Sequence, residues 1–226
     1  MRIPKNPVPR PWAKPIAPYQ EEGEKEGKHL VVKSILEEKW GSEMLNEQQY
    51  MAVLMDPPWK STHPNDDRAV EVKDLEKMDL PRTASFLFIW TEKQDIPKLV
   101  KMLEGKGYNY VENLAWVKQR VNNTFAEQSS DFFKRSKITL LFFRKNTNEQ
   151  IELRHQRNPD VYFDFVRSMV VEGTTLDREE KPELIFHTIE TLLPTANYNE
   201  EKGHGRLLYL WSPTCHRKSW TTVSEI

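Results

Sequence analysis

Residues 51–59 join a short apolar run to an acid, two prolines and a tryptophan. The run Met-Ala-Val-Leu-Met ends at Asp56, whose carboxylate accepts hydrogen bonds. Pro57 and Pro58 fix φ, remove two backbone donors and leave their carbonyls free to accept, and Trp59 offers a flat apolar ring. Such a corner suits a planar heterocycle with an exocyclic amine, whose hydrogens would bind the carboxylate and a proline carbonyl. The alternative is a turn after an edge strand, followed by a core tryptophan.

A buried strand must end at this corner to place it at the edge of a sheet, and the apolar residues 50–55 predict such a strand. Residues 85–90 predict a second strand. Both runs are almost continuously apolar, which is typical of strands covered on both faces. Further strands are predicted at residues 111–118, 138–144, 166–171 and 207–211.

Helices are predicted between the strands. Residues 30–40 favour one. A second begins at Asp95, a capping residue, has Pro97 in its first turn and ends at Gly105 and Gly107. A third covers residues 181–193 before Pro194, with its apolar face formed by Leu184, Ile185, Ile189 and Leu192.

This alternation predicts an α/β fold, with a mostly parallel sheet and helices on both faces. Ligands of such sheets bind beyond the carboxyl ends of the strands. Asp56 and the segment after Trp211 both fall at that edge.

Composition limits the possible classes of protein. The chain has 226 residues, of which 30% are charged, and a mean hydropathy of -0.72. It has no apolar run long enough to span a membrane and no apolar leader. The single cysteine, Cys215, excludes an intrachain disulfide and fits a reducing compartment. A net charge of -1 means that nucleic-acid binding would require a local basic patch or a basic partner.

The composition also divides the chain. Residues 1–28 are rich in proline and charge and predict an extended arm, and residues 29–226 predict one folded domain. The linker-like opening suggests a fragment of a longer protein. Loops at residues 60–75, 119–136 and 145–163 are long enough to be lids or binding loops, although solvated connectors would look the same.

Several chemistries find no support in the sequence. The histidines and Cys215 lack metal-ligand spacing, so no metal is expected. His187 is interpreted as a packing or surface residue of its helix. Neither a Gly-x-Ser-x-Gly elbow nor a phosphate-binding glycine loop occurs.

The chain resembles a known enzyme family in four blocks of sequence. The blocks are the corner at residues 56–59, Phe-Leu-Phe-Ile-Trp at 86–90, Trp-Val-Lys at 116–118 and Lys-Pro-Glu at 181–183. In order and spacing they are similar to the eukaryotic N6-adenine methyltransferases. That family includes the catalytic subunit of the messenger-RNA adenosine methyltransferase, and a ciliate branch that methylates DNA. The resemblance covers about residues 45–223.

The resemblance implies a class I, Rossmann-like fold with permuted motif order and S-adenosylmethionine as methyl donor. It assigns catalysis to Asp56, Pro57, Pro58 and Trp59, and implies that Lys181 pairs with the donor carboxylate. The expected donor-binding residues are Asp56, Lys181, Trp211, Ser212, Thr214 and His216. The expected substrate-binding residues are Trp59, Lys60 and Lys118.

The segment after Trp211 departs from the family pattern. The messenger-RNA enzymes have Gly-Arg-Pro-His-Asn there, whereas only His216 has an obvious counterpart in this chain, displaced by about one residue. Glu179 and Glu180 also replace small polar residues found upstream of the family lysine. Contacts to the donor ribose and to the substrate are therefore expected to differ.

The expected function is that of a catalytic subunit that methylates adenine N6, with DNA favoured over RNA. The near-zero net charge suggests that affinity for nucleic acid comes partly from a partner subunit, so a heterodimer with a non-catalytic paralogue, and with further DNA-binding subunits, is expected in the nucleus. The loop at residues 122–137 is the segment predicted to contact the partner. The alternatives are an RNA methyltransferase, a non-catalytic scaffold, and a methyltransferase for small molecules or proteins. Retention of the whole corner and of Lys181 favours an active enzyme.

Overall fold

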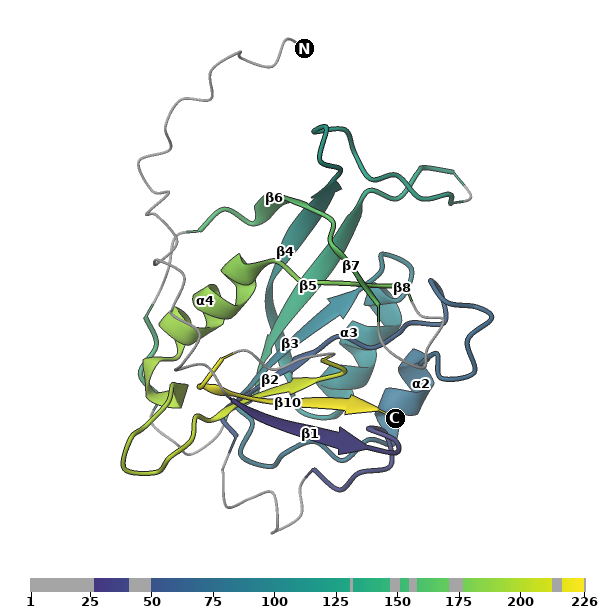
Figure 1. Cartoon of the computed structure of the whole chain (residues 1–226). Helices are drawn as coiled ribbons and strands as arrows, with labels where there is room; N and C mark the ends of the chain where they lie inside the picture. Colours follow the sequence, from purple (N-terminus) through teal and green to yellow (C-terminus); the bar gives the residue numbers. More distant parts are fainter. Residues whose placement is uncertain are drawn as a thin grey trace.

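The computed structural model describes residues 27–40, 50–130, 132–146, 151–154, 158–170, 177–212 and 217–225. Its centre is an eight-stranded sheet (Figure 1). The strands are β1 (Lys28–Val32), β2 (Ala52–Met55), β3 (Phe86–Thr91), β4 (Asn109–Gln119), β5 (Lys137–Arg144), β6 (Val161–Phe165), β9 (Leu207–Leu210) and β10 (Trp220–Glu225). The remaining elements are the hairpin β7 (Ser168–Val170) and β8 (Asp177–Glu179), the helices α2 (Val72–Glu76), α3 (Ile96–Gly105) and α4 (Glu183–Leu192), and the 3-10 turn η1 (Pro194–Ala196).

The sheet order is β1-β10-β9-β2-β3-β5-β4-β6. The first five strands are parallel, β5 is antiparallel to both β3 and β4, and β6 is parallel to β4. From β2 the chain builds the sheet outward on one side, through β3, and later returns to the other side through β9. The boundary between β2 and β9 is therefore the point where the strand order reverses, and open α/β sheets bind ligands at that point.

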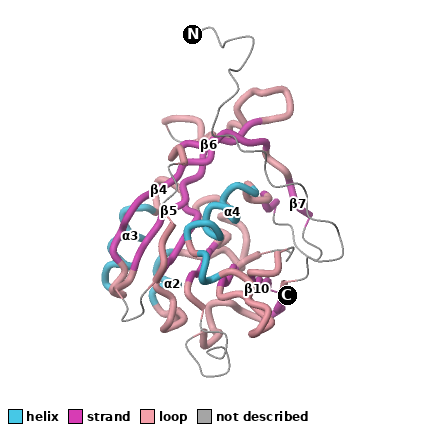
Figure 2. The backbone as a smooth tube through the Cα atoms, turned by 90° about the vertical axis from the view of Figure 1, so that its left-hand side faces the viewer, coloured by secondary structure: helices cyan, strands magenta, loops and turns pink. Residues whose placement is uncertain are grey.

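Two apolar cores cover the sheet, one on each face. The first includes Val53, Ile89 and Leu99 and lies under α2 and α3. The second includes Leu54, Trp90 and Ile185 and lies under α4. Figure 2 shows α3 and α4 on opposite sides of β4 and β5. The prediction of helices on both faces is confirmed.

Most predicted elements exist, with boundaries shifted by a few residues. The predicted helix at residues 30–40 is wrong, because the chain there forms β1 and then turns around residues 35–37. Its apolar residues are needed at the sheet edge, where Leu30 pairs with Val223 of β10. The strand predicted at 166–171 is displaced and divided between β6, which ends at Phe165, and β7.

Helix boundaries follow local signals. Asp95 occupies the N-cap of α3 but makes no capping hydrogen bond, because its carboxylate accepts one from Ser61 at 2.7 Å. Gly105 is the last residue of α3, and Gly107 has a φ of 86°. In α4 the fully buried residues are Ile185 and Ile189. Leu192 is partly buried against the core, and His187 is exposed.

The glycine before β9 provides a test of this packing. A Cβ on Gly205 would lie 2.2 Å from the backbone oxygen of Ser219, which leads into β10. We expect Gly205→Ala to destabilise the protein by about 1–3 kcal/mol, because neither backbone segment can move without disturbing a central strand. Gly105→Ala is the matched control, since no atom lies within 4 Å of its added Cβ. It should be neutral or stabilising by up to about 1 kcal/mol in denaturant unfolding. Equal effects of the two substitutions would contradict the close approach at Gly205.

The helices in the described ranges are all too short or too polar to cross a membrane.

Candidate active site

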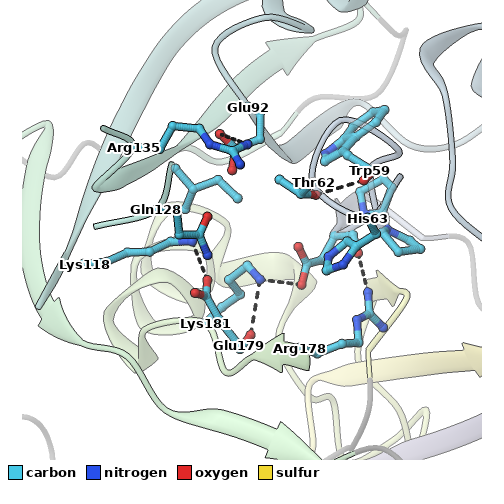
Figure 3. Close-up of a pocket in the computed structure, with 14 residues that line it drawn as sticks. Trp59, Thr62, His63, Glu92, Lys118, Gln128, Arg135, Arg178, Glu179 and Lys181 are labelled. Atoms are coloured by element: carbon cyan, nitrogen blue, oxygen red, sulfur yellow. Dashed lines mark hydrogen bonds and ion pairs between the residues drawn. The ribbon is translucent and has the colours of Figure 1, made fainter. Parts of the chain in front are cut away.

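A cleft opens at the carboxyl ends of β2 and β3 and is closed on its far side by β8 (Figure 3). It contains about 760 Å3 of space free of protein atoms, part of which is open to solvent. Its lining comes from distant parts of the chain: Asp56, Pro57, Pro58, Trp59, Thr62, His63, Glu92, Lys118, Gln128, Arg135, Ile138, Arg178, Glu179 and Lys181. The switch point of the sheet therefore does carry a polar cleft.

The acid-proline corner follows β2 directly. The backbone N–H of Asp56 donates to Leu210 of β9 at 3.2 Å, so the corner begins inside the sheet. The carbonyl of Pro58 accepts from Val70 at 2.8 Å. The carbonyl of Pro57 accepts no hydrogen bond from any described residue. Asp56 and Pro57 both line the cleft, and the Pro57 carbonyl is an acceptor that the described residues leave unused.

Lys181 holds the Asp56 carboxylate. Its ammonium donates to Oδ2 of Asp56 at 2.6 Å and to the backbone oxygen of Glu179 at 3.2 Å. Both side chains are less than one-tenth exposed. Burial lowers the pKa of Lys181 below its ordinary value, although the Asp56 carboxylate opposes this shift. The third N–H of the ammonium has no acceptor among the described residues.

Other charges surround this pair. Arg178 of β8 donates to the backbone oxygen of Asp56 at 2.6 Å, and Lys118 of β4 pairs with Glu179 at 2.5 Å. Glu92, just after β3, lies 3.9 Å from Arg135. Burial raises the pKa of Glu92, against the opposing charges of Lys118 and Arg135.

The structure brings only some of the predicted site residues into the cleft. Asp56, Pro57, Pro58, Lys118 and Lys181 line it. Trp59 also lines it but is only 3% exposed, and its indole N–H donates to the backbone of Trp90 at 2.7 Å. The ring is therefore largely a core element, and its role in binding the substrate stays a prediction.

The remaining predicted residues lie elsewhere. Lys60 is exposed, pairs with Glu71 at 3.7 Å and does not line the cleft. Trp211 and Ser212 are both 1% exposed, beyond the end of β9. Thr214 and His216 lie outside the described residues. The donor-binding roles of these residues stay predictions.

Sequence reasoning did not assign a role to several residues that line the cleft. Glu92 could have been found from the sequence. It comes two residues after the strand predicted at 85–90, and Asp56 comes directly after the strand predicted at 50–55. Arg178 and Glu179 precede the family lysine, but only the β7–β8 hairpin shows that they face the cleft. His63, Gln128 and Arg135 come from predicted loops, in which no residue pattern marks one polar side chain over another.

The parallel strands, the switch point and the acidic corner are those of a Rossmann-like α/β methyltransferase. A family model for MT-A70 matches residues 50–224, which extends from β2 through all but the last residue of β10. The chain therefore belongs to the MT-A70 family, whose members are methyltransferases that use S-adenosylmethionine as methyl donor. A search among curated proteins finds no match.

The side chains present fit this donor, which carries a carboxylate on its amino-acid end. The unused N–H of the buried Lys181 ammonium can donate to a carboxylate. A second buried donor, the indole N–H of Trp211, also has no hydrogen-bond partner in the described part of the chain. Trp211 has a φ of 62°, a strained value for a non-glycine residue of the kind that clusters at binding sites. Trp211 itself does not line the cleft and packs in the core on the α2–α3 side, so Lys181 is the donor-binding candidate that lies within the cleft.

The sequence expectation that no metal takes part stays a prediction. Within the described ranges, no three His, Cys, Asp or Glu side chains gather as a metal-binding group. No step of the chemistry below requires one.

Glu92 gives a prediction on pH. Because the folded protein raises its pKa above the ordinary 4.5, the stability that Glu92 contributes is complete below pH 4.5 and lost as pH rises through the folded value. Glu92→Gln cannot ionise, so its melting temperature relative to wild type should increase across that window. Thermal melts over a pH series measure the difference.

Glu71→Gln is the matched control, because Lys73 lowers the pKa of Glu71. The melting temperature of Glu71→Gln relative to wild type should increase as pH falls, because wild type then loses the stability that the ionised Glu71 contributes. If the difference in melting temperature between Glu92→Gln and wild type does not vary with pH, the pKa of Glu92 is not raised in the folded protein.

Proposed function

We propose that this protein transfers a methyl group from S-adenosylmethionine to the N6 amine of adenine in nucleic acid, with DNA favoured over RNA. The observation that carries the proposal is the pair of acceptors at the end of β2. The Asp56 carboxylate lines the cleft beside a Pro57 carbonyl that no described residue occupies. Two neighbouring acceptors match the two hydrogens of an exocyclic amine.

The adenine N6 is a weak nucleophile because its lone pair is conjugated into the ring. Asp56 and the Pro57 carbonyl each accept one amine hydrogen, which polarises the nitrogen and fixes its direction. Lys181 keeps the Asp56 side chain oriented through its bond to Oδ2, so that Oδ1 remains for the amine. Lys181 would hold the donor through its carboxylate, and the donor would supply an electrophilic methyl group on a positively charged sulfur.

Positioning supplies much of the catalysis in this scheme. The charge of the sulfonium falls during transfer, so no strong base is needed before the methyl moves. Holding the reacting atoms in line is worth up to several kcal/mol. Asp56 Oδ1 then receives the proton that N6 loses.

The preference for DNA rests on the sequence. The chain has a loose likeness to the ciliate branch, and it departs from the pattern of the messenger-RNA enzymes at residues 60–75 and 212–216. Contact with a 2′-hydroxyl separates RNA from DNA readers. Methyl transfer from labelled donor to matched DNA and RNA strands tests the substrate directly.

The test has three informative outcomes. Label in N6-methyladenine of DNA supports the proposal, and label in RNA alone selects the RNA methyltransferase. The third outcome is a protein that transfers no label and binds no donor in calorimetry, which would identify a scaffold paralogue. Adding a paralogous partner chain to each reaction distinguishes an inactive subunit from an incomplete enzyme.

We also propose that a paralogous subunit covers one end of the sheet, in the nucleus. β6 is an edge strand, and its Val161, Phe163 and Phe165 are 36–48% exposed. Phe165 lies beside Gln119, where β4 enters the loop that carries Phe132 and Phe133, which are 92% and 77% exposed. Exposed apolar side chains in such number are typical of an interaction surface.

The double substitution Phe132→Ser with Phe133→Ser tests this surface. It should abolish co-purification with the paralogue without lowering the melting temperature. Fluorescence microscopy tests the nuclear location.

A further inference from the structure

Arg135 lines the cleft but takes no part in the scheme above. It precedes β5 in the loop from β4, and Figure 3 shows its side chain beside Glu92. Backbone hydrogen bonds of 2.8 Å run in both directions between Arg135 and Gln128, which also lines the cleft. The position of the Arg135 backbone at the cleft is therefore fixed by the loop itself.

The cations of the cleft differ in how they are held. Lys118, Arg178 and Lys181 each make a contact of 2.5–2.6 Å to an acidic or carbonyl oxygen. Arg135 makes none among the described residues. Its Nη1 lies 3.9 Å from Glu92, beyond hydrogen-bond distance, and its Nε is buried without a partner.

This arrangement is costly for the ligand-free protein. A guanidinium with an unsatisfied buried N–H gains free energy when a small rotation brings it to an acceptor. Nη1 faces Glu92, so the opposite edge, formed by Nε and Nη2, is the one without a partner among the residues that the structure describes. That edge has the geometry for two parallel hydrogen bonds to a phosphate or a carboxylate.

We propose that Arg135 binds a backbone phosphate of the strand that carries the target adenine. The inference rests on the proposed function, because an extruded base brings its flanking phosphates to the mouth of the pocket that receives it. The cleft also has a favourable charge, since it holds four cations (Lys118, Arg135, Arg178 and Lys181) and three carboxylates (Asp56, Glu92 and Glu179). In a chain with a net charge of -1, this local excess supplies attraction that the whole chain lacks.

The neighbouring carboxyl does not prevent the contact. Glu92 is buried, its pKa is raised, and an approaching phosphate raises it further, which favours the neutral acid. The donor carboxylate is a less suitable ligand for Arg135, because the unused N–H of Lys181 already serves that group near Asp56.

The experiment compares Arg135→Gln, Arg135→Lys and the control Arg144→Gln. Arg144 ends β5 opposite the first residue of β3, at the far edge of the sheet, and its removal changes the net charge equally. Fluorescence anisotropy measures the affinity for a labelled single strand with one adenine over a range of salt concentrations. Calorimetry measures the donor affinity of each variant, and thermal melting confirms the fold.

The expected result is a loss of about tenfold in strand affinity for Arg135→Gln, and a salt slope smaller by about 0.7. Arg135→Lys should restore the slope, because a lysine still neutralises one phosphate. Donor affinity and the Arg144→Gln variant should match wild type.

Three results would overturn the inference while leaving the proposed function intact. They are an unchanged salt slope, a changed preference for adenine over other bases, which would assign Arg135 to the base edge, and a loss of donor affinity, which would assign it to the donor carboxylate. If wild type shows neither strand binding nor methyl transfer, the proposed function fails and the inference fails with it.

Discussion

Asp56→Asn is expected to lower the turnover of methyl transfer at least about a hundredfold. Asparagine has the shape of aspartate, and its single carbonyl oxygen can still accept the hydrogen bond from Lys181. The side-chain NH2 of the asparagine then faces the N6 amine of the substrate. Both groups are hydrogen-bond donors, so the hydrogen bond that the Asp56 carboxylate accepted is lost. The reaction loses its orientation and its proton acceptor together.

The measurement is single-turnover transfer from labelled donor at saturating strand concentration. The melting temperature should also fall, because the buried Lys181 ammonium keeps its hydrogen bond but loses its counter-charge, so transfer is measured well below the melting temperature of the variant. Asp74→Asn is the control, since Asp74 closes the capping box of α2 outside the cleft and should affect stability only. Near-normal turnover of Asp56→Asn would exclude Asp56 from catalysis.

Lys181→Met should have the second-largest effect. It removes the ammonium but keeps most of the volume of the side chain, so the donor carboxylate loses a charge-assisted hydrogen bond. Donor affinity should fall at least about tenfold. The variant should also lose about 3–5 kcal/mol of stability, because Asp56 is left as a buried carboxylate without its cation.

A double variant separates these two effects. Asp56→Asn combined with Lys181→Met removes both charges, so part of the lost stability should return while donor affinity stays low. Lys106→Met is the control, since Lys106 is a partly buried lysine that donates to Met78 away from the cleft. A donor affinity that returns to the wild-type value in the double variant would show that Lys181 acts only through Asp56.

Much of the central fold was predictable because buried parallel strands leave a clear signal. Residues 50–55 and 85–90 are apolar almost throughout, and β2 and β3 are buried at every position. The corner after β2 was predictable for the same reason, since a strand of known direction places the next residue at a known edge. Lys181 was found only through the family resemblance.

The edges of the sheet were harder to predict. β1 is exposed or only partly buried at every position, so it lacks the continuous apolar run of the central strands, and its strand conformation depends on pairing with β10. β10 carries threonine and serine among its apolar residues and gave no strong signal. The positions of Arg178 and Arg135 in the cleft depend on the hairpin and on the β4–β5 loop, whose positions no local pattern encodes.

The pairing of Ala52 with Leu207 joins strands from nearly opposite ends of the matched region. High contact order of this kind slows folding, because a long loop must close before the central hydrogen bonds form. During synthesis on the ribosome, β2 and β3 emerge long before β9 can cover them. We therefore expect nascent chains that stop before Leu207 to be recognised by chaperones and to bind no donor.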